Sequence, residues 1–155
     1  MSTIEMPKTQ PKFSFVDEYP AAPAEAAAKH FLARLSVETD VSDVVTDLER
    51  GNPNLIVLDV RSAEDYEICH VPGAVSLPHR QINAQTTARF SKDATLVTYC
   101  WGPACNSATK AAAKLSALGF RVKEMLGGIE YWRNEGCDVE GTLGSEAPLF
   151  WKHSA

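Results

Sequence analysis

The sequence predicts an α/β fold, with a mainly parallel central sheet that helices flank on both faces. Two apolar runs, residues 55–60 and 95–99, have the β-branched and aliphatic composition of strands that are covered on both sides. Stretches of helical composition alternate with these runs, and the clearest is residues 107–118, which is rich in Ala, Lys and Leu. Strands that alternate with helices in this way favour a parallel sheet.

Length and charge narrow the class of protein. A chain of 155 residues is long enough for one domain with a hydrophobic core and too short for two large ones. Its net charge of −5 argues against a nucleic-acid-binding surface. Its apolar runs are shorter than the roughly 20 residues of a membrane span, and residues 1–20 lack the apolar segment of a secretory signal. We therefore expect neither nucleic acid nor membrane as a partner.

The N-terminal part is expected to be an arm followed by a helix. Residues 1–23 are polar and contain four prolines, which favours an extended arm. Pro23 suits the first position of a helix, which we predict over residues 24–35, within an extension that covers residues 24–40. A homodimer that forms through the terminal extensions is one possible assembly.

The main domain is predicted over residues 41–140 and begins with two capped helices. Thr39 or Asp40 is expected to cap a helix over residues 41–50. Ser62 is expected to cap a short helix over residues 63–68, after the strand at 55–60. A second short strand follows at residues 74–77, and residues 79–90 are expected to be partly helical.

The rest of the chain is predicted to be a strand, a helix and a tail. The strand covers residues 122–126, and the Gly127–Gly128 turn leads into a helix over residues 129–134. Tyr131 and Trp132 of this helix are expected in the core. The tail, residues 141–155, is irregular but carries Leu149, Phe150 and Trp151, and apolar residues of this kind usually pack on the domain or on a partner.

The chemistry is expected where the strand at 95–99 meets the helix at 107–118. Cys100 follows this strand directly, and Gly102–Pro103 break the run and allow a tight turn. A loop between a strand and a helix N-terminus directs backbone N–H groups inward, and these donors form a cradle for an anion. We therefore predict that the thiolate of Cys100 is stabilised, and the thiolate is the nucleophilic form. In such sheets, sites lie at the carboxyl ends of strands, where Arg61 also falls.

Three stretches together resemble the rhodanese-like (sulfurtransferase) domain family. Residues 59–74 resemble the family's aspartate–x–arginine segment and its histidine–aliphatic–proline–glycine–alanine turn. Cys100 stands in the position of the family's sulfur-carrying cysteine. Residues 127–136 resemble its double glycine, tryptophan and closing glycine. The resemblance implies a single rhodanese-like domain with an N-terminal helical extension and a lengthened active-site loop.

The loop after Cys100 departs from the family pattern. It is longer by one or two residues, lacks Arg and Lys, and carries a second cysteine, Cys105. Related phosphatases and arsenate reductases close a longer loop on an arginine, but Asn106 or Ser107 stands in that place here. A phosphate or arsenate dianion would lose its bidentate partner, so sulfur transfer is the preferred interpretation.

The resemblance implies that Cys100 is the catalytic residue of a thiosulfate sulfurtransferase-like enzyme. Its thiolate would take sulfur from thiosulfate or a similar donor and pass it from a persulfide to a thiol or cyanide acceptor. Residues expected to bind substrate are Trp101, Gly102, Pro103, Ala104, Cys105, Asn106, Ser107, Arg61 and Arg80. No metal or organic cofactor is required, and the cysteine usage points to a reducing cytoplasm.

Several alternatives stay open. Arg61 could bind an anionic substrate or pair with a carboxylate such as Asp65 or Glu67, and Arg80 is the first candidate to attract thiosulfate. Cys105 could resolve an oxidised or persulfidated Cys100 through a disulfide, which would suit a thiol redox enzyme or arsenate reductase. A further alternative is a non-catalytic binding or regulatory module.

Overall fold

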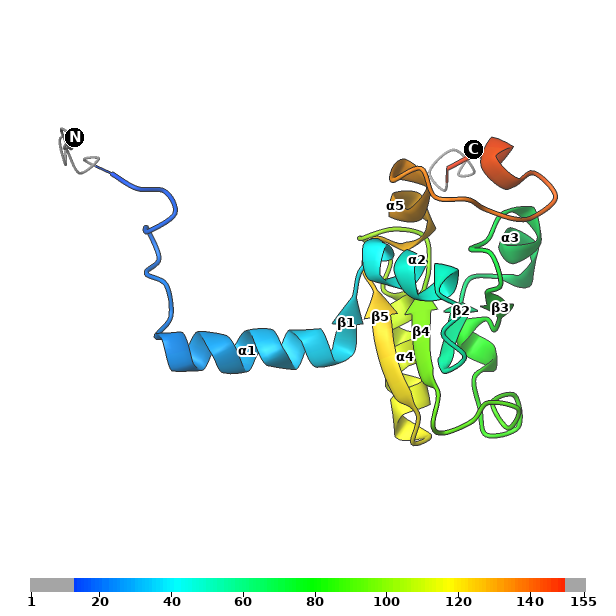
Figure 1. Ribbon diagram of the computed structural model, residues 1–155, viewed down its shortest axis with the longest axis horizontal. Helices are drawn as coiled ribbons and strands as arrows, with labels where there is room; N and C mark the ends of the chain where they lie inside the picture. The colour runs from blue at the N-terminus through cyan, green and yellow to red at the C-terminus, as the bar shows by residue number, and fades with distance from the viewer. Residues whose placement is uncertain (1–12, 150–155) are drawn as a thin grey trace. The chain divides into compact units, whose positions relative to one another are not determined.

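The chain separates into two units, residues 1–33 and 34–155, and the computed structural model describes residues 13–149 (Figure 1). In the first unit, the rings of Phe13 and Phe15 meet edge to face, with their centroids 4.8 Å apart. Helix α1, Ala24–Val37, begins there and has no buried residue. Pro23 lies just before the helix and its carbonyl accepts from the Ala27 N–H, so the expectation of Pro23 at the first helical position is wrong by one residue.

The second unit is built on a five-stranded parallel sheet with strand order β1-β5-β4-β2-β3. Its strands are β1 Glu38–Thr39, β2 Leu55–Asp59, β3 Val75–Ser76, β4 Thr95–Tyr99 and β5 Arg121–Met125. The predicted α/β class and parallel sheet are therefore confirmed. The two-residue strand β1, which pairs with β5 at the sheet edge, was not predicted.

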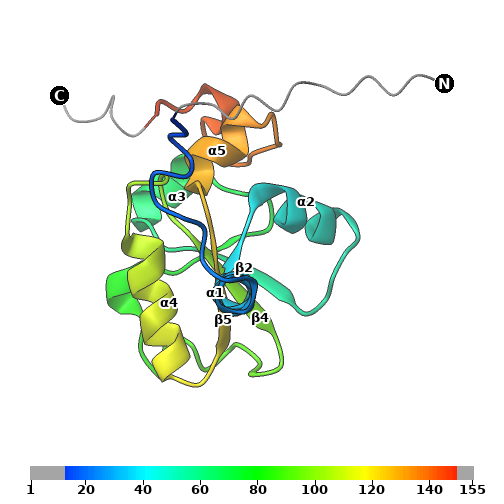
Figure 2. The same ribbon diagram turned by 90° about the vertical axis from the view of Figure 1, so that its left-hand side faces the viewer.

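Helices cover both faces of this sheet. On one face lie α2 (Val41–Glu49), α3 (Ala63–Ile68) and α5 (Gly128–Asn134), and on the other lies α4 (Ser107–Ala117), as Figure 2 shows for α2 and α4. Side chains alternate along β4, so Val97 and Tyr99 join the first core cluster, whereas Leu96 joins the cluster beneath α4. Burial on both faces explains why β2 and β4 read as continuous apolar runs.

The predicted helix caps are confirmed at two positions. The Asp40 carboxylate accepts from the Asp43 N–H at 2.8 Å and caps α2. The Ser62 hydroxyl accepts from the Asp65 N–H at 3.1 Å and caps α3. Both caps satisfy N–H groups that would otherwise lack partners at the helix start.

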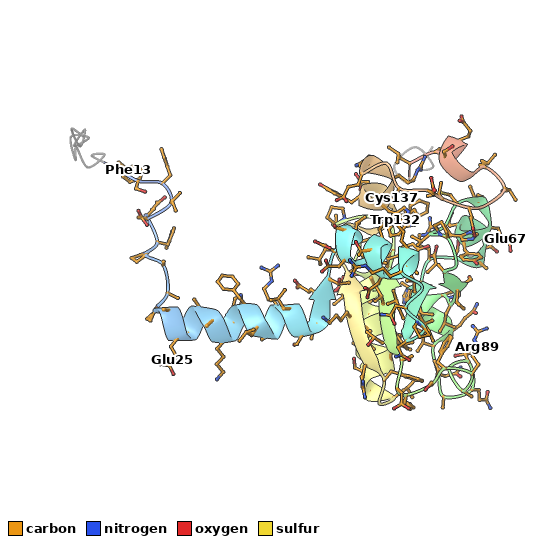
Figure 3. The ribbon with its side chains drawn as sticks, viewed as in Figure 1. Phe13, Glu25, Glu67, Arg89, Trp132 and Cys137 are labelled. Carbon is orange, nitrogen blue, oxygen red and sulfur yellow. The ribbon has the colours of Figure 1, made fainter. Side chains whose placement is uncertain are left out.

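Around α5 and the tail, the structure confirms one predicted core residue and corrects another. Trp132 is 3% exposed and lies beside Cys137 (Figure 3), but Tyr131 is 46% exposed and does not belong to the core. The tail continues through a short 3₁₀ helix, Gly144–Glu146, and packs on its own domain. There Arg133 donates to the carbonyl oxygens of Ser145 and Ala147. Phe150 and Trp151 lie outside the described residues.

Residues 79–90 contain one short 3₁₀ helix, His79–Gln81, followed by turns. Across residues 13–149, no helix combines the length and the apolar character that would let it cross a bilayer.

Candidate functional site

Cys100 lies at the carboxyl end of β4, where the chain enters the loop that leads to α4. Its side chain is 2% exposed and belongs to the core cluster beneath α4, together with Leu58 and Ala108. The thiol donates a hydrogen bond to the carbonyl oxygen of Cys105, 3.3 Å from Sγ. The loop therefore curls back over the Cys100 sulfur and separates it from solvent.

Hydrogen bonds within and after the loop hold this shape. The Cys105 N–H donates to the Gly102 carbonyl at 3.1 Å, which forms the tight turn that Gly102 and Pro103 predict. The buried Thr98 hydroxyl donates to the Ala108 carbonyl at 3.0 Å. This bond ties the first turn of α4 to β4 and places the helix N-terminus beside Cys100.

The surroundings of Cys100 disfavour its thiolate. Burial raises the pKa of the Cys100 thiol from 9.0 to about 12, and its contact with the Cys105 side chain adds to the increase. The backbone N–H groups of Ala108 and Trp101 lower the pKa of Cys100, but they do not outweigh burial. The prediction of a stabilised Cys100 thiolate is thus wrong for the free thiol, because the loop covers the sulfur in a way that the sequence does not show.

Cys105 has the opposite electrostatic balance. Burial opposes its ionisation, but hydrogen bonds from the Cys100 side chain and from the backbone and hydroxyl of Ser107 outweigh this and lower the pKa of Cys105. The Trp101 N–H contributes in the same direction. As the pH rises, Cys105 therefore ionises before Cys100. The Trp101 N–H lowers the pKa of both thiols, so its effect is divided between two sulfur atoms, and the cradle of N–H donors around Cys100 stays a prediction.

A pocket of about 490 Å³ opens beside Cys105. Its walls come from the loop, from α5 and from the tail, and its lining residues are Trp101, Gly102, Pro103, Ala104, Cys105, Asn106, Ile129, Glu130, Arg133 and Leu149. Cys100 does not line it. The sulfur atom that a small molecule in this pocket meets is therefore that of Cys105.

The N-terminus of α5 is hydrogen-bonded to the backbone of the loop. The Ile129 N–H donates to the Cys100 carbonyl and the Glu130 N–H to the Trp101 carbonyl, both at 2.9 Å. Gly128 permits this close approach, because its φ is +62° and a Cβ there would lie 2.6 Å from the Cys100 carbonyl oxygen. The double glycine therefore lets a helix N-terminus dock on the backbone that carries the two cysteines.

The comparison with known proteins agrees with this architecture. The sequence profile of the rhodanese-like domain matches residues 40–135. The chain belongs to the rhodanese-like domain family. The matched range contains both loop cysteines and ends just after α5.

Two relatives of this chain are named for different functions, one for transcriptional regulation and one for sulfur transfer. The chain is 31% identical over 128 residues to the HTH-type transcriptional regulator Rv0324 of Mycobacterium tuberculosis, a match that covers 80% of this chain and 53% of the regulator. It therefore spans about half of that relative's length. It is 37% identical over 79 residues to the thiosulfate sulfurtransferase GlpE of Pseudomonas savastanoi, covering 50% of this chain and 72% of that enzyme.

A solved structure is also similar over most of the chain. The crystal structure of the BH2092 protein from Bacillus halodurans is 56% identical and superimposes with a TM-score of 0.82. This match covers 83% of this chain and 94% of the BH2092 chain. The similarity shows that the architecture is shared.

Arg61 of this rhodanese-like domain is buried, and it lines the pocket that also contains Arg80, so substrate binding by Arg61 stays a prediction. Its Nη2 lies 2.7 Å from the Asp59 carboxylate, and the Arg61 side chain is 2% exposed. It also donates to the Cys69 carbonyl. The carboxylate that pairs with Arg61 is therefore that of Asp59, and the suggested pairing with Asp65 or Glu67 is wrong. The Arg61 guanidinium stacks on the Trp101 ring, 4.4 Å from its centroid, so it positions one wall of the loop.

Arg80 lies away from the cysteine-lined pocket. It is exposed and lines a second pocket of about 430 Å³, together with His79, Trp101 and Ser107. Trp101 lines both pockets and thus separates them. Neither Cys100 nor Cys105 lines the pocket that contains Arg80.

Sequence reasoning missed three contributors to the site. Tyr99 donates to the Asp59 carboxylate at 2.6 Å and accepts from the Val71 N–H at 3.1 Å, so it links the buried ion pair to the turn after α3. Glu130 and Arg133 place a carboxylate and a guanidinium on the pocket wall. Their spacing of three residues on one helix is a signal that could have paired them on a common face.

Proposed function

We propose that this protein is a sulfurtransferase that moves sulfane sulfur from thiosulfate or a similar donor to a thiol or cyanide acceptor through a persulfide on Cys100. The observation that carries the proposal is the position of Cys100: it directly follows the central strand of a rhodanese-like domain and lies in the loop that leads to the N-terminus of α4. The similarity to a protein named thiosulfate sulfurtransferase supports the same chemistry.

The reaction needs two displacements. In the first, the outer sulfur of thiosulfate passes to the enzyme as its bond to the sulfite group breaks, and sulfite leaves with the bonding electron pair. In the second, an acceptor thiolate or cyanide attacks the outer sulfur of the persulfide, and the cysteine thiolate leaves. Such a covalent route gives ping-pong kinetics. A persulfide ionises more readily than a thiol, so the N–H groups of Trp101 and Ala108 would hold the loaded, anionic form.

The charge that attracts an anionic donor would come from outside the loop. Within residues 100–107 the loop has no Arg or Lys, and the Arg61 guanidinium is already bound to Asp59. Arg80, exposed at the neighbouring pocket, is the residue we assign to this attraction, which acts over distances longer than a contact. All four cysteines are free thiols, and we place the protein in a reducing cytoplasm on that basis.

A second candidate function is dithiol–disulfide redox chemistry. It is favoured by one observation, the hydrogen bond from the Cys100 thiol to the Cys105 carbonyl oxygen, which brings the two cysteines into contact. A redox enzyme would cycle through a Cys100–Cys105 disulfide and would need no sulfane donor. The arsenate-reductase version is weaker, because no cationic side chain closes the loop.

The test is a transfer assay with variants. Cys100→Ser should lose most of the thiocyanate formation from thiosulfate and cyanide, because the variant has no sulfur at the position that bears the persulfide. Cys137→Ser is the matched control, since Cys137 is a partly exposed cysteine outside the loop, and it should keep the wild-type rate. Wild-type transfer by Cys100→Ser would refute the assignment. A wild-type protein inactive with every sulfane donor would favour the binding-module alternative.

A further inference from the structure

Cys105 has access to the pocket, and Cys100 does not. Cys105 is partly exposed and lines the 490 Å³ pocket, whereas Cys100 is 2% exposed and lines neither this pocket nor the one beside Arg80. A donor molecule that enters the pocket therefore reaches the sulfur of Cys105 first. A direct reaction with Cys100 would require the loop to open.

We propose that Cys105 takes the sulfane sulfur from the donor first and passes it inward to Cys100, so that the two cysteines act in sequence within one loop. This inference rests on the proposed function and assigns to Cys105 a catalytic role in it. Two features of the geometry carry it: Cys105 lines the pocket, and the Cys100 sulfur lies 3.3 Å from the carbonyl oxygen of Cys105, so the two cysteines are in direct contact.

In the first step the Cys105 thiolate attacks the outer sulfur of thiosulfate. A sulfur–sulfur bond forms to Cys105, the bond between the outer sulfur and the sulfite group breaks, and sulfite leaves with the electron pair. The products are a Cys105 persulfide anion and sulfite, so charge and atoms balance. The lowered pKa of Cys105 supplies the thiolate that this step needs.

In the second step Cys100 attacks the outer sulfur of the Cys105 persulfide. The new bond joins this sulfur to Cys100, and Cys105 leaves as a thiolate that accepts the proton released by Cys100. The proton has a short path, because the Cys100 thiol already donates to the carbonyl oxygen of Cys105, the residue that receives the proton. The direction is favourable, because the more acidic thiol is the better leaving group and the less acidic thiol, once deprotonated, is the stronger nucleophile.

The surroundings of Cys100 also suit it as the final carrier of the sulfane sulfur. A persulfide on Cys100 would receive the N–H groups of Trp101 and Ala108 and would lie beneath the loop, away from water. On Cys105 the same persulfide would remain in the open pocket. The buried cysteine therefore serves as the protected store, and the exposed cysteine receives the sulfur from the donor.

The test follows the sulfur along the chain in time. The full-length protein is mixed with thiosulfate or with a low-molecular-weight alkyl persulfide, quenched with iodoacetamide at successive times and digested with trypsin. Residues 93–110 form one tryptic peptide with both cysteines, and fragmentation at the Gly102–Pro103 bond separates them. The extra sulfur should appear on Cys105 at the earliest times and on Cys100 later.

Variants give an independent readout. Cys105→Ser should slow the loading of Cys100 about 30-fold or more at neutral pH. A pKa of about 12 instead of 9.0 lowers the thiolate population about 1000-fold, and the greater nucleophilicity of the more basic thiolate recovers only part of this loss. Cys100→Ser should still acquire sulfur on Cys105. Cys137→Ser should behave as wild type, and the wild-type loading rate should level off at a lower pH than that of an ordinary cysteine.

The outcomes separate this inference from the proposed function. Sulfur on Cys100 before Cys105, or wild-type loading of Cys100 in Cys105→Ser, would overturn the relay and leave sulfur transfer intact. Stoichiometric release of sulfide with a Cys100–Cys105 disulfide would also overturn it, because Cys100 would then attack the inner sulfur. No added sulfur on either cysteine with both donors would overturn the relay and the proposed function together.

Discussion

Two cysteines in one short loop differ in how readily they ionise. Cys100 and Cys105 are five residues apart, yet burial raises the pKa of the first and local donors lower the pKa of the second. The sequence was sufficient to single out Cys100, because a cysteine that follows a buried strand and precedes a helix is unusual. It could not show this difference in pKa, since that depends on the path of the loop over the sulfur.

The buried Asp59–Arg61 ion pair beside the loop was not predicted either, although the spacing of the two residues could have indicated it. Asp59 and Arg61 are two residues apart at a strand end, and side chains at this spacing on extended backbone share a face. Asp65 and Glu67 were suggested as partners of Arg61, and only the structure shows that Asp59 is the carboxylate in contact.

The cost of breaking this pair is a residue-level prediction. Asp59→Asn should lower the free energy of unfolding by about 3–5 kcal/mol, because it leaves the buried Arg61 guanidinium without its counter-charge. Arg34→Gln is the control: it removes the exposed Arg34–Glu38 pair and should cost at most about 1 kcal/mol. Urea denaturation of the three proteins measures both values. Equal, small effects would show that the pair does not hold this end of the sheet together.

At the scale of elements, the active loop depends on a neighbouring helix as much as on its own residues. Helix α5 contributes two N–H donors to the carbonyls of Cys100 and Trp101, and only a glycine at residue 128 lets it come so close. The sequence predicted this helix within one residue of its start but offered no reason for the double glycine beyond a turn. That reason lies in a contact between segments far apart in the chain.

A matched glycine pair tests this dependence. Gly128→Ala should destabilise the fold by about 3 kcal/mol or more, because it combines a left-handed backbone with a clash against the loop and the loss of two hydrogen bonds. Gly136→Ala has a similar φ of +78° but open space around its Cβ, so it should cost only about 1–2 kcal/mol. Urea denaturation and the sulfur-transfer assay measure the two variants. If the transfer rate and stability of Gly128→Ala matched those of Gly136→Ala, the docking of α5 would not support the loop.

The other elements show which signals are reliable. Apolar runs with clear turn residues predicted β2 and β4 to within one residue, and side-chain caps marked the starts of α2 and α3. Strand β1 escaped prediction because two residues, Glu38 and Thr39, carry no periodicity. Its pairing with β5 follows from tertiary structure alone.

At the scale of the whole molecule, the topology explains why the site lies where it does. The parallel order β1-β5-β4-β2-β3 brings the carboxyl ends of β2 and β4 side by side, and the Asp59–Arg61 pair and Cys100 both lie at this edge. The core cluster beneath α4 then encloses Cys100, and α5 and the tail complete the pocket on Cys105. The sequence pattern predicted this edge of the sheet. It could not predict the pocket, whose walls come from three separate segments of the chain.

The intact mass of the wild-type protein shows whether this fold holds a sulfane sulfur covalently. After exposure to thiosulfate and removal of the excess, the protein should gain the mass of one sulfur atom, and a thiol reductant or cyanide should remove it. Cys137→Ser should show the same gain, whereas Cys100→Ser should pass sulfur to cyanide far more slowly than the wild type. An unchanged mass for the wild-type protein under these conditions would show that the fold does not carry sulfane sulfur.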